Sequence, residues 1–197
     1  MKNKWKYKTP GIPDYMFIRG KVPMTKEEIR IITIGKLRIN DNDTIVDIGA
    51  GTGSISIEAA LQATNGQIFA VERNEEAVQL IINNKDKFEV KNIQVIQGVA
   101  PNALNVVPIV DKAIVGGSGG NLRGIFDWID INLKQNGRIV INAITLETLH
   151  KSLDILKNRN YDDIEVVHVA IARSRNIANM TMMEAQNPIY IISATKR

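Results

Sequence analysis

The stretch that most constrains the fold is residues 44–53, which change from a β-strand pattern to a glycine turn and then to a helix pattern. Residues 44–48 form a β-branched apolar run interrupted only by Asp47, and the apolar residues after the turn recur at helical spacing. Glycines at positions 49, 51 and 53 permit positive φ angles and let a ligand approach the bare backbone. The first N–H groups of the helix would point at that ligand, with the positive end of the helix dipole behind them. The stretch therefore predicts a ligand site at a strand–turn–helix junction.

The spacing of the three glycines separates two classes of cofactor. A dinucleotide-binding turn reads G-x-G-x-x-G or A, which would place the third small residue at position 54, where this chain has serine. Here the third glycine is Gly53, and Asp47 stands two residues before the first. This G-x-G-x-G pattern resembles the first motif of class I S-adenosylmethionine (AdoMet) methyltransferases. A nucleotide-binding or purely structural glycine turn is the alternative.

A carboxylate in the next predicted strand supports the ligand interpretation. Residues 67–71 read as a strand that ends at Glu72, about twenty residues after the glycines. At the carboxyl end of the neighbouring strand, a carboxylate can accept hydrogen bonds from both ribose hydroxyls of a nucleoside. The alternative is a solvated charge that opens the following loop. The spacing between the glycine turn and Glu72 favours the ligand interpretation.

Length and composition indicate one domain without metal or disulfides. With 197 residues and 44% hydrophobic content, we expect a single domain, residues 1–197, with an amino-terminal tail and arm over 1–24 and a core over 25–197. The absence of cysteine, with only His150 and His168 present, predicts no metal site, and both histidines are expected to be structural. No apolar run has membrane-spanning length and the start lacks the apolar core of a signal peptide, so we expect a cytoplasmic protein without a membrane partner.

The net charge of +4 is confined to the amino terminus. Residues 1–20 carry five cations against Asp14, which already gives +4, so residues 21–197 sum to zero; the cations are Lys2, Lys4, Lys6, Lys8 and Arg19. A short lysine-rich terminus is more often a solvated tail than a binding arm. We therefore expect no nucleic-acid partner.

Strand and helix patterns alternate along most of the chain. The arm at 10–24, with three prolines and two glycines, precedes a helix for which Thr25 and Glu28 form a predicted capping box. Further strands are predicted at 93–97, 111–115 and 138–142, and helices at 75–88, 122–133 (ended by a turn at 135–137) and 146–157. Two last strands, 164–172 and 189–195, are joined by a loop and should pair antiparallel. The predicted fold is α/β, a seven-stranded, mostly parallel Rossmann-like sheet with an antiparallel strand near one edge and helices on both faces.

Two loops lie at the predicted ligand edge of this sheet. Gly98, Val99 and Ala100 follow the third strand and either line an adenine or form an ordinary turn. Residues 116–120 follow the fourth strand and contain four glycines, Gly116, Gly117, Gly119 and Gly120, around Ser118. Such a costly loop suggests a large or flat substrate close to the backbone. The loop lacks the Asn/Asp-Pro-Pro-aromatic string of enzymes that methylate exocyclic base nitrogens.

Cationic side chains near the predicted site are candidates for substrate carboxylates. Arg173 and Arg175 lie in the loop between the last two strands, and Arg19 and Lys21 lie in the arm. Guanidinium groups suit carboxylates because they form paired hydrogen bonds with them. The alternative is that these side chains are solvated.

Five strings together resemble one family. They are Gly11-Ile12-Pro13-Asp14, Val22-Pro23-Met24-Thr25-Lys26-Glu27-Glu28-Ile29-Arg30, Asp47-Ile48-Gly49-Ala50-Gly51-Thr52-Gly53-Ser54, Val115-Gly116-Gly117-Ser118-Gly119-Gly120, and Ala172-Arg173 with Thr181-Met182-Met183. They are similar to the decarboxylating cobalt-precorrin-6B C(15)-methyltransferase family of cobalamin biosynthesis, over nearly the whole chain from Gly11. The resemblance implies a homotetramer, a tetrapyrrole (cobalt-precorrin) substrate and AdoMet held by Thr25, Gly49, Ala50, Gly51, Thr52, Gly53, Glu72, Gly98, Val99 and Ala100. One departure is Val99, where the family has a carboxylate near the adenine.

The resemblance also implies a reaction, methylation of C-15 of the tetrapyrrole with decarboxylation of its C-12 acetate side chain. Because the conjugated ring can supply the nucleophile, no general base is expected and no catalytic residue is assigned. An AdoMet-dependent methyltransferase acting on tRNA, rRNA or another nucleic acid is the alternative. A non-catalytic nucleotide-binding module is a more distant one.

Overall fold

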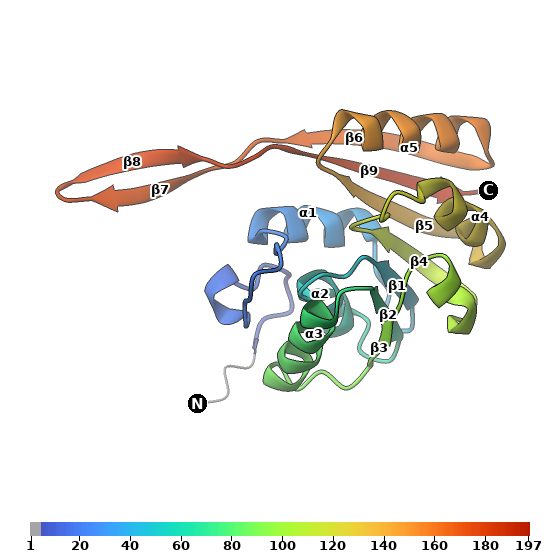
Figure 1. Ribbon diagram of the computed structural model, residues 1–197, viewed down its shortest axis with the longest axis horizontal. Coiled ribbons are helices and arrows are strands. Elements are labelled where there is room, and N and C mark those ends of the chain that lie inside the picture. The colour runs from blue at the N-terminus through green and yellow to red at the C-terminus, as the bar shows by residue number, and fades with distance from the viewer. Residues whose placement is uncertain (1–4) are drawn as a thin grey trace.

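The computed structural model describes residues 5–197, so Lys2 and Lys4 of the predicted tail lie outside the described residues. A seven-stranded sheet has the order β3-β2-β1-β4-β5-β9-β6, and a separate two-stranded sheet joins β7 and β8 (Figure 1). The strands are β1 Thr44–Ile48, β2 Gln67–Glu72, β3 Ile93–Gln97, β4 Val110–Val115, β5 Leu133–Ala143, β6 Tyr161–Val169, β7 Ala172–Ile177, β8 Met180–Ala185 and β9 Ile189–Lys196. The helices are α1 Glu27–Leu37, α2 Ser54–Gln62, α3 Glu75–Lys87, α4 Leu122–Asn132 and α5 Leu146–Asn158, with short 3-10 turns η1 Asp14–Met16 and η2 Asn102–Val106.

The predicted fold class is confirmed. Strands β1 to β5 pair in parallel, and β9 runs antiparallel to both β5 and β6. The predicted antiparallel pairing of the last two strands of the sheet is therefore confirmed. No helix within residues 5–197 is long and apolar enough to cross a membrane.

Helices cover both faces of the sheet, which explains why the central strands are mostly apolar on both faces. Alternate residues of β1 enter opposite cores: Val46 and Ile48 pack with α4 and α5, whereas Ile45 packs with α1, α2 and α3. All three are at most 1% exposed. This burial fixes the strand register and holds the glycine turn at the carboxyl end of β1.

The predicted capping box at the start of α1 is wrong. The N-cap is Lys26, and no side chain caps this end of the helix. The Thr25 carbonyl instead accepts a hydrogen bond from Arg30, and the Glu28 carboxylate accepts two from Arg173. Both oxygens of the Glu28 carboxylate are thus engaged by the Arg173 guanidinium, which can form paired hydrogen bonds that a backbone N–H cannot.

Two boundaries near the carboxyl-terminal half also differ from the prediction. The turn at 135–137 lies inside β5, which begins at Leu133 and includes Asn136 at φ 60°. The segment expected to be a loop before the last strand is a β-hairpin, β7–β8, that projects from the body (Figure 1). Its sequence lacks the apolar alternation of a half-buried strand, since all of β8 is exposed.

The arm packs against the helices of one face of the sheet. The N–H groups of Gly11 and Ile12 donate to Glu58 of α2, at 2.8 and 3.2 Å. Farther along, the N–H of Ile18 donates to Asn84 of α3 at 2.7 Å. Arg30 is fully buried beneath the arm and donates to Glu58, to Asp14 and to the Ile12 carbonyl. These bonds hold the arm against the body, and the arm ends near the edge of the sheet where β1 ends.

Candidate active site

The glycine turn lies between β1 and α2 and touches the second glycine loop. Gly49, Gly51 and Gly53 have φ angles of 73°, 57° and 76°, a region that side chains with a Cβ rarely adopt. A Cβ on Gly49 would lie 2.7 Å from the backbone N and O of Gly117. Glycine is therefore required at position 49 both by its φ angle and by the backbone of the loop after β4.

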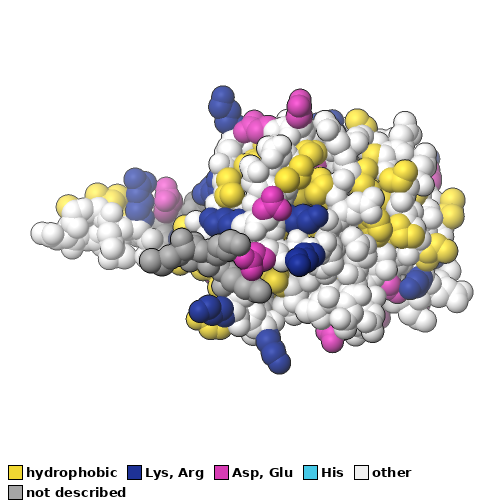
Figure 2. Space-filling view, turned by 90° about the horizontal axis from the view of Figure 1, so that it is seen from below, with side chains coloured by type: hydrophobic (Ala, Val, Ile, Leu, Met, Phe, Trp, Pro, Cys, Tyr) yellow, Lys and Arg dark blue, Asp and Glu magenta, His cyan; other side chains and the backbone are white. Residues whose placement is uncertain are grey.

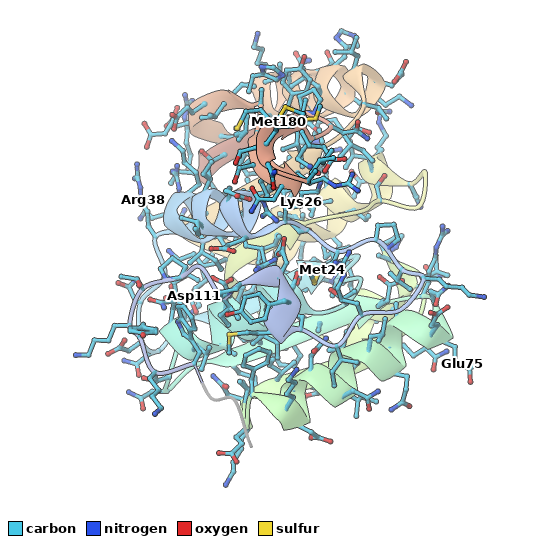
Figure 3. The ribbon with its side chains drawn as sticks, turned by 90° about the vertical axis from the view of Figure 1, so that its left-hand side faces the viewer. Met24, Lys26, Arg38, Glu75, Asp111 and Met180 are labelled. Atoms are coloured by element: carbon cyan, nitrogen blue, oxygen red, sulfur yellow. The ribbon has the colours of Figure 1, made fainter. Side chains whose placement is uncertain are left out.

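A cavity of about 340 Å³ opens above this turn, and we call it the turn cavity. The residues that line it come from the arm, α1, the turn and the ends of β5 and β9; among them are Met24, Thr25, Lys26, Asp47, Gly49, Ala50, Gly51, Thr52, Asn142, Ile144 and Ile189. Figure 3 shows Met24 and Lys26 toward the middle of the molecule, whereas Arg38 and Glu75 point outward. Predicted residues Thr25 and 49–52 thus lie around one cavity.

Two buried polar atoms in the lining of the turn cavity lack a hydrogen-bond partner among the described residues. They are Oγ1 of Thr52, a residue 1% exposed, and Nδ2 of Asn142, a residue 9% exposed. Such atoms usually have a partner, because an unsatisfied buried polar group costs about 1–3 kcal/mol. The turn cavity is therefore suited to a ligand with polar groups of its own.

Asp47 is buried in the floor of the turn cavity. Burial raises its pKa to about 6, and the Glu72 carboxylate adds to this effect, while the Ser56 hydroxyl, 2.5 Å away, opposes it by donating a hydrogen bond. The carboxylate also accepts from the backbone N–H of Ser56 in the first turn of α2. Asp47 therefore connects the strand to the helix and places negative charge beside the turn.

Glu72 lines a second cavity, of about 500 Å³, which we call the Glu72 cavity. Its carboxylate accepts hydrogen bonds from the N–H groups of Gly51 (2.9 Å), Arg73 (2.8 Å) and Asn74 (2.9 Å). These bonds fix the carboxylate at the end of β2, facing the glycine turn. The other predicted cofactor residues, Gly98, Val99 and Ala100, line the same cavity, and Val99 is 58% exposed there.

The glycine loop at 116–120 contacts both cavities, and more than one structural requirement explains its glycines. Gly116 and Gly117 donate their N–H groups to the Ile48 carbonyl and pack against the backbone of Gly49. Gly119 and Gly120 have φ angles of 56° and 92°. Close packing of two loops and positive φ angles therefore account for these glycines without a ligand. The loop as floor for a flat substrate stays a prediction.

The four cations predicted to bind substrate carboxylates are not brought together. Arg173 donates to Glu28 at 2.5 and 2.9 Å and to Asp14 at 2.9 Å. Hydrogen bonds from Arg173 hold the pKa of Glu28 below its usual value. Arg175 lies on the projecting hairpin, 3.5 Å from Glu184, and Arg19 and Lys21 are exposed on the arm. None of the four lines either cavity.

The structure adds residues that the sequence did not single out as ligands. Asn142, Lys26 and Arg73 line the cavities, and neither cation forms an ion pair with another residue of 5–197. An asparagine at the end of the apolar run 139–141 was a usable signal for a polar group at the ligand edge. For the two cations the sequence offered none, since exposed lysine and arginine are common.

A third, smaller cavity of about 240 Å³ lies between the glycine loop, the end of β5 and the start of α5, and we call it the β5 cavity. It shares Gly116, Asn142 and Ile144 with the turn cavity. With the Glu72 cavity it shares Gly117, Ser118 and Ile144. The three cavities therefore meet at the glycine loop.

Comparisons with known proteins agree with this arrangement. A family model described as a precorrin methyltransferase domain matches residues 16–196. A Saccharolobus solfataricus protein named "Probable cobalt-precorrin-6B C(15)-methyltransferase (decarboxylating)" is 41% identical over 98% of this chain and 99% of the relative. A Salmonella typhimurium protein named "Cobalt-precorrin-6B C(15)-methyltransferase (decarboxylating)" is 35% identical over 93% of this chain and 95% of the relative. Among solved structures, a precorrin-6y C5,15-methyltransferase from Geobacter metallireducens GS-15 has a TM-score of 0.90 and 42% identity, covering 94% of this chain and 98% of that chain.

Proposed function

Because the chain belongs to the precorrin methyltransferase family and has the class I methyltransferase fold, we propose that it methylates C-15 of cobalt-precorrin-6B and decarboxylates the C-12 acetate side chain. The observation that carries this proposal is the meeting of three cavities at the carboxyl ends of β1, β4 and β5, around two glycine loops. In open α/β sheets, ligands bind at this edge. The space suits a cofactor on one side of the glycine loop and a large ring on the other.

The residues around the turn fit AdoMet as the methyl donor. Its two ribose hydroxyls match the Glu72 carboxylate, and its amino-acid end carries polar groups that match the unpartnered atoms of Thr52 and Asn142. We propose that Thr25 and residues 49–52 hold the methionine part, and that Gly98, Val99 and Ala100 line the adenine. The predicted cofactor residue Gly53 lines neither cavity and packs against Ile81 of α3. AdoMet supplies a methyl group that a sulfonium makes reactive toward nucleophiles.

In the proposed mechanism the protein aligns the methyl donor with the ring and removes water from them, and no side chain abstracts a proton. His150 is exposed on α5, and His168 lies on β6 with its ring 4.8 Å from the Tyr190 ring; neither lines any of the three cavities. The conjugated ring can provide the nucleophilic carbon itself. Holding donor and acceptor in line can supply roughly 7–11 kcal/mol of the barrier reduction.

For the substrate, we propose that residues 116–120 form the floor and the arm at 11–24 the cover. The arm already walls both larger cavities through Pro23, which supports this placement. Arg19, Lys21 and Arg175 stay candidates for peripheral carboxylates. Arg173 can take this role only by giving up Asp14 or Glu28, so we assign it first to the protein and second to the substrate.

We further propose that the protein is a homotetramer assembled through the β7–β8 hairpin. An isolated two-stranded hairpin is only marginally stable in water, yet this one extends away from the body (Figure 1). Its apolar side chains Ile177, Met180 and Met182 share one face and are 43%, 68% and 52% exposed. Figure 2 shows a few hydrophobic side chains along one edge of the projecting hairpin. A second copy of the chain would cover them.

Methyl-labelled AdoMet tests the proposed function directly. Incubation with cobalt-precorrin-6B should place the label in the tetrapyrrole, whose mass should show both the gain of the methyl group and the loss of CO2. The nucleic-acid alternative has little electrostatic support, because acidic and basic side chains are interspersed on the face shown in Figure 2. Label that enters tRNA but not the tetrapyrrole would show that alternative to be correct. The absence of transfer to either, with AdoMet bound, would favour the binding module.

A further inference from the structure

Every side chain that lines the β5 cavity is uncharged. Val115, Leu122 and Ile141 form its apolar wall, and Ser118, Thr145 and Thr148 supply neutral hydroxyls. The two neighbouring cavities differ, since Asp47 and Lys26 line the turn cavity and Glu72 and Arg73 line the Glu72 cavity. Of the three cavities that meet at the glycine loop, the β5 cavity is therefore the one whose lining, within residues 5–197, has no ionic side chain.

Its position suits a side chain of the substrate better than AdoMet. The cavity lies on the far side of the glycine loop from Glu72, between the end of β5 and the start of α5. Gly116 and Ile144 line both this cavity and the turn cavity, so one side chain of a ring that rests on residues 116–120 can enter it beside them. A volume of about 240 Å³ is sufficient for such a side chain but not for the ring.

The chemistry of decarboxylation favours such a space. The bond between the methylene and carboxyl carbons breaks, CO2 leaves, and the bonding electron pair passes into the conjugated ring, which later takes one proton from water. The carboxylate charge is thereby dispersed in the transition state. Water or a cation would stabilise the localised charge of the reactant more than the dispersed charge, so a neutral, dry environment lowers the barrier.

We propose that the β5 cavity is the decarboxylation subsite, which takes up the acetate side chain of the substrate and keeps water and cations from its carboxylate. This inference rests on the proposed function and assigns its second step to a place in the structure. Asn142 also lines this cavity, and its unpartnered Nδ2 can donate a hydrogen bond to the carboxylate, but burying a carboxylate without a cation is still costly. The cost is met by binding the other carboxylates of the ring, for which Lys26 and Arg73 are free at the neighbouring cavities.

The test is to place a positive charge in the cavity and compare it with a neutral side chain of similar length. Thr148→Lys and Thr148→Met share one half-buried position in α5 and differ in charge. At saturating AdoMet and cobalt-precorrin, CO2 release by Thr148→Lys should be at least about tenfold slower than by Thr148→Met. The substrate should bind Thr148→Lys as tightly as Thr148→Met, or more tightly, when its absorbance is titrated, because the ammonium group pairs with the carboxylate.

A second pair of variants is needed in case the lysine at position 148 points outward from α5 and not into the cavity. Ser118→Lys and Ser118→Met make the same comparison from the glycine loop, after calorimetry has verified that each still binds AdoMet. CO2 release rates within twofold between lysine and methionine at both positions, in folded proteins, would overturn the proposal. Failure of the proposed function looks different, because the unsubstituted protein would then transfer no methyl group to the tetrapyrrole.

Discussion

At the scale of single residues, Asp47 makes the stability of the protein depend on pH. Its pKa rises from 3.8 to about 6 on folding, chiefly through burial. Between about pH 4 and pH 6 the folded protein binds more protons here than the unfolded chain, so stability falls as the pH rises through this window. The gap between the two pKa values corresponds to roughly 3 kcal/mol.

Asp47→Asn should remove this dependence. Urea unfolding of the protein and of this variant, without ligand, at several pH values from 4 to 7 gives the comparison. We expect the free energy of unfolding of the unsubstituted protein to fall by roughly 2 kcal/mol relative to Asp47→Asn over that range, because part of the full effect is already lost at pH 4. Parallel curves for the two proteins would show that Asp47 does not titrate in this window.

Glu72 is the residue on which cofactor binding should depend most. Glu72→Ala is expected to weaken AdoMet binding by about 1.5–3 kcal/mol in calorimetry, the range for a lost hydrogen bond to a charged group. Glu75→Ala is the matched control, because Glu75 is exposed at the start of α3 and points outward in Figure 3. In the same calorimetry, the unsubstituted protein should not bind NAD. Circular dichroism should show both variants folded, since Glu72 is only half-buried. Equal AdoMet affinity for both variants would remove Glu72 from the site.

Single residues could be predicted where their role depends on the neighbouring sequence, and not where it depends on residues far along the chain. Glycines with required φ angles and a carboxylate at a strand end are local features, and the structure places Gly49, Gly51 and Glu72 around neighbouring cavities as expected. The partners of Arg173 could not be predicted, because Asp14 and Glu28 lie 159 and 145 residues away along the chain. Only the folded structure shows that the Arg173 side chain already donates hydrogen bonds to two carboxylates.

At the scale of elements, Arg173 joins three segments. It extends from the start of β7 to Asp14 in the arm and Glu28 in α1. Although burial opposes it, hydrogen bonds from Arg30 and Arg173 hold the pKa of Asp14 below its usual value. The base of the hairpin therefore supports the arm that walls the cavities.

Arg173→Ala should loosen the arm without unfolding the protein. Because Arg173 is 36% exposed, we expect a loss of only about 1 kcal/mol in stability. Hydrogen–deuterium exchange should become faster in residues 12–24 and stay unchanged in α3. Arg175→Ala is the control, since Arg175 is 63% exposed and does not contact the arm. An arm that exchanges equally slowly in both variants would refute this coupling.

The sequence predicted the elements better than their ends. Apolar periodicity located the parallel strands and the helices, because burial on both faces of the sheet leaves a strong pattern. It did not locate β7 and β8, whose side chains are nearly all exposed and so leave no such pattern. The capping box failed for a related reason, since the Glu28 carboxylate accepts hydrogen bonds from Arg173, 145 residues away along the chain.

At the scale of the whole molecule, the exposed hairpin predicts the oligomeric state. The double variant Ile177→Asp with Met180→Asp places two charges, opposite each other, on the hairpin face that also carries Met182 and Arg175. Light scattering after gel filtration should report four chains for the unsubstituted protein and fewer for the double variant, because burying unpaired carboxylates is unfavourable. Thr181→Asp, on the opposite face of β8, should keep four chains. A tetramer that survives the double variant, or an unsubstituted protein that is monomeric, would contradict assembly through this face.

The central claim is that one active site both methylates and decarboxylates a tetrapyrrole. The most direct measurement counts, in one sample, the methyl groups transferred from labelled AdoMet and the CO2 released from cobalt-precorrin-6B by this protein. Cavities that meet at one glycine loop predict one CO2 for each methyl group, with both counts reduced in Glu72→Ala at limiting AdoMet. Methyl transfer with no CO2 release, or neither product from a folded protein that binds AdoMet, would contradict the claim.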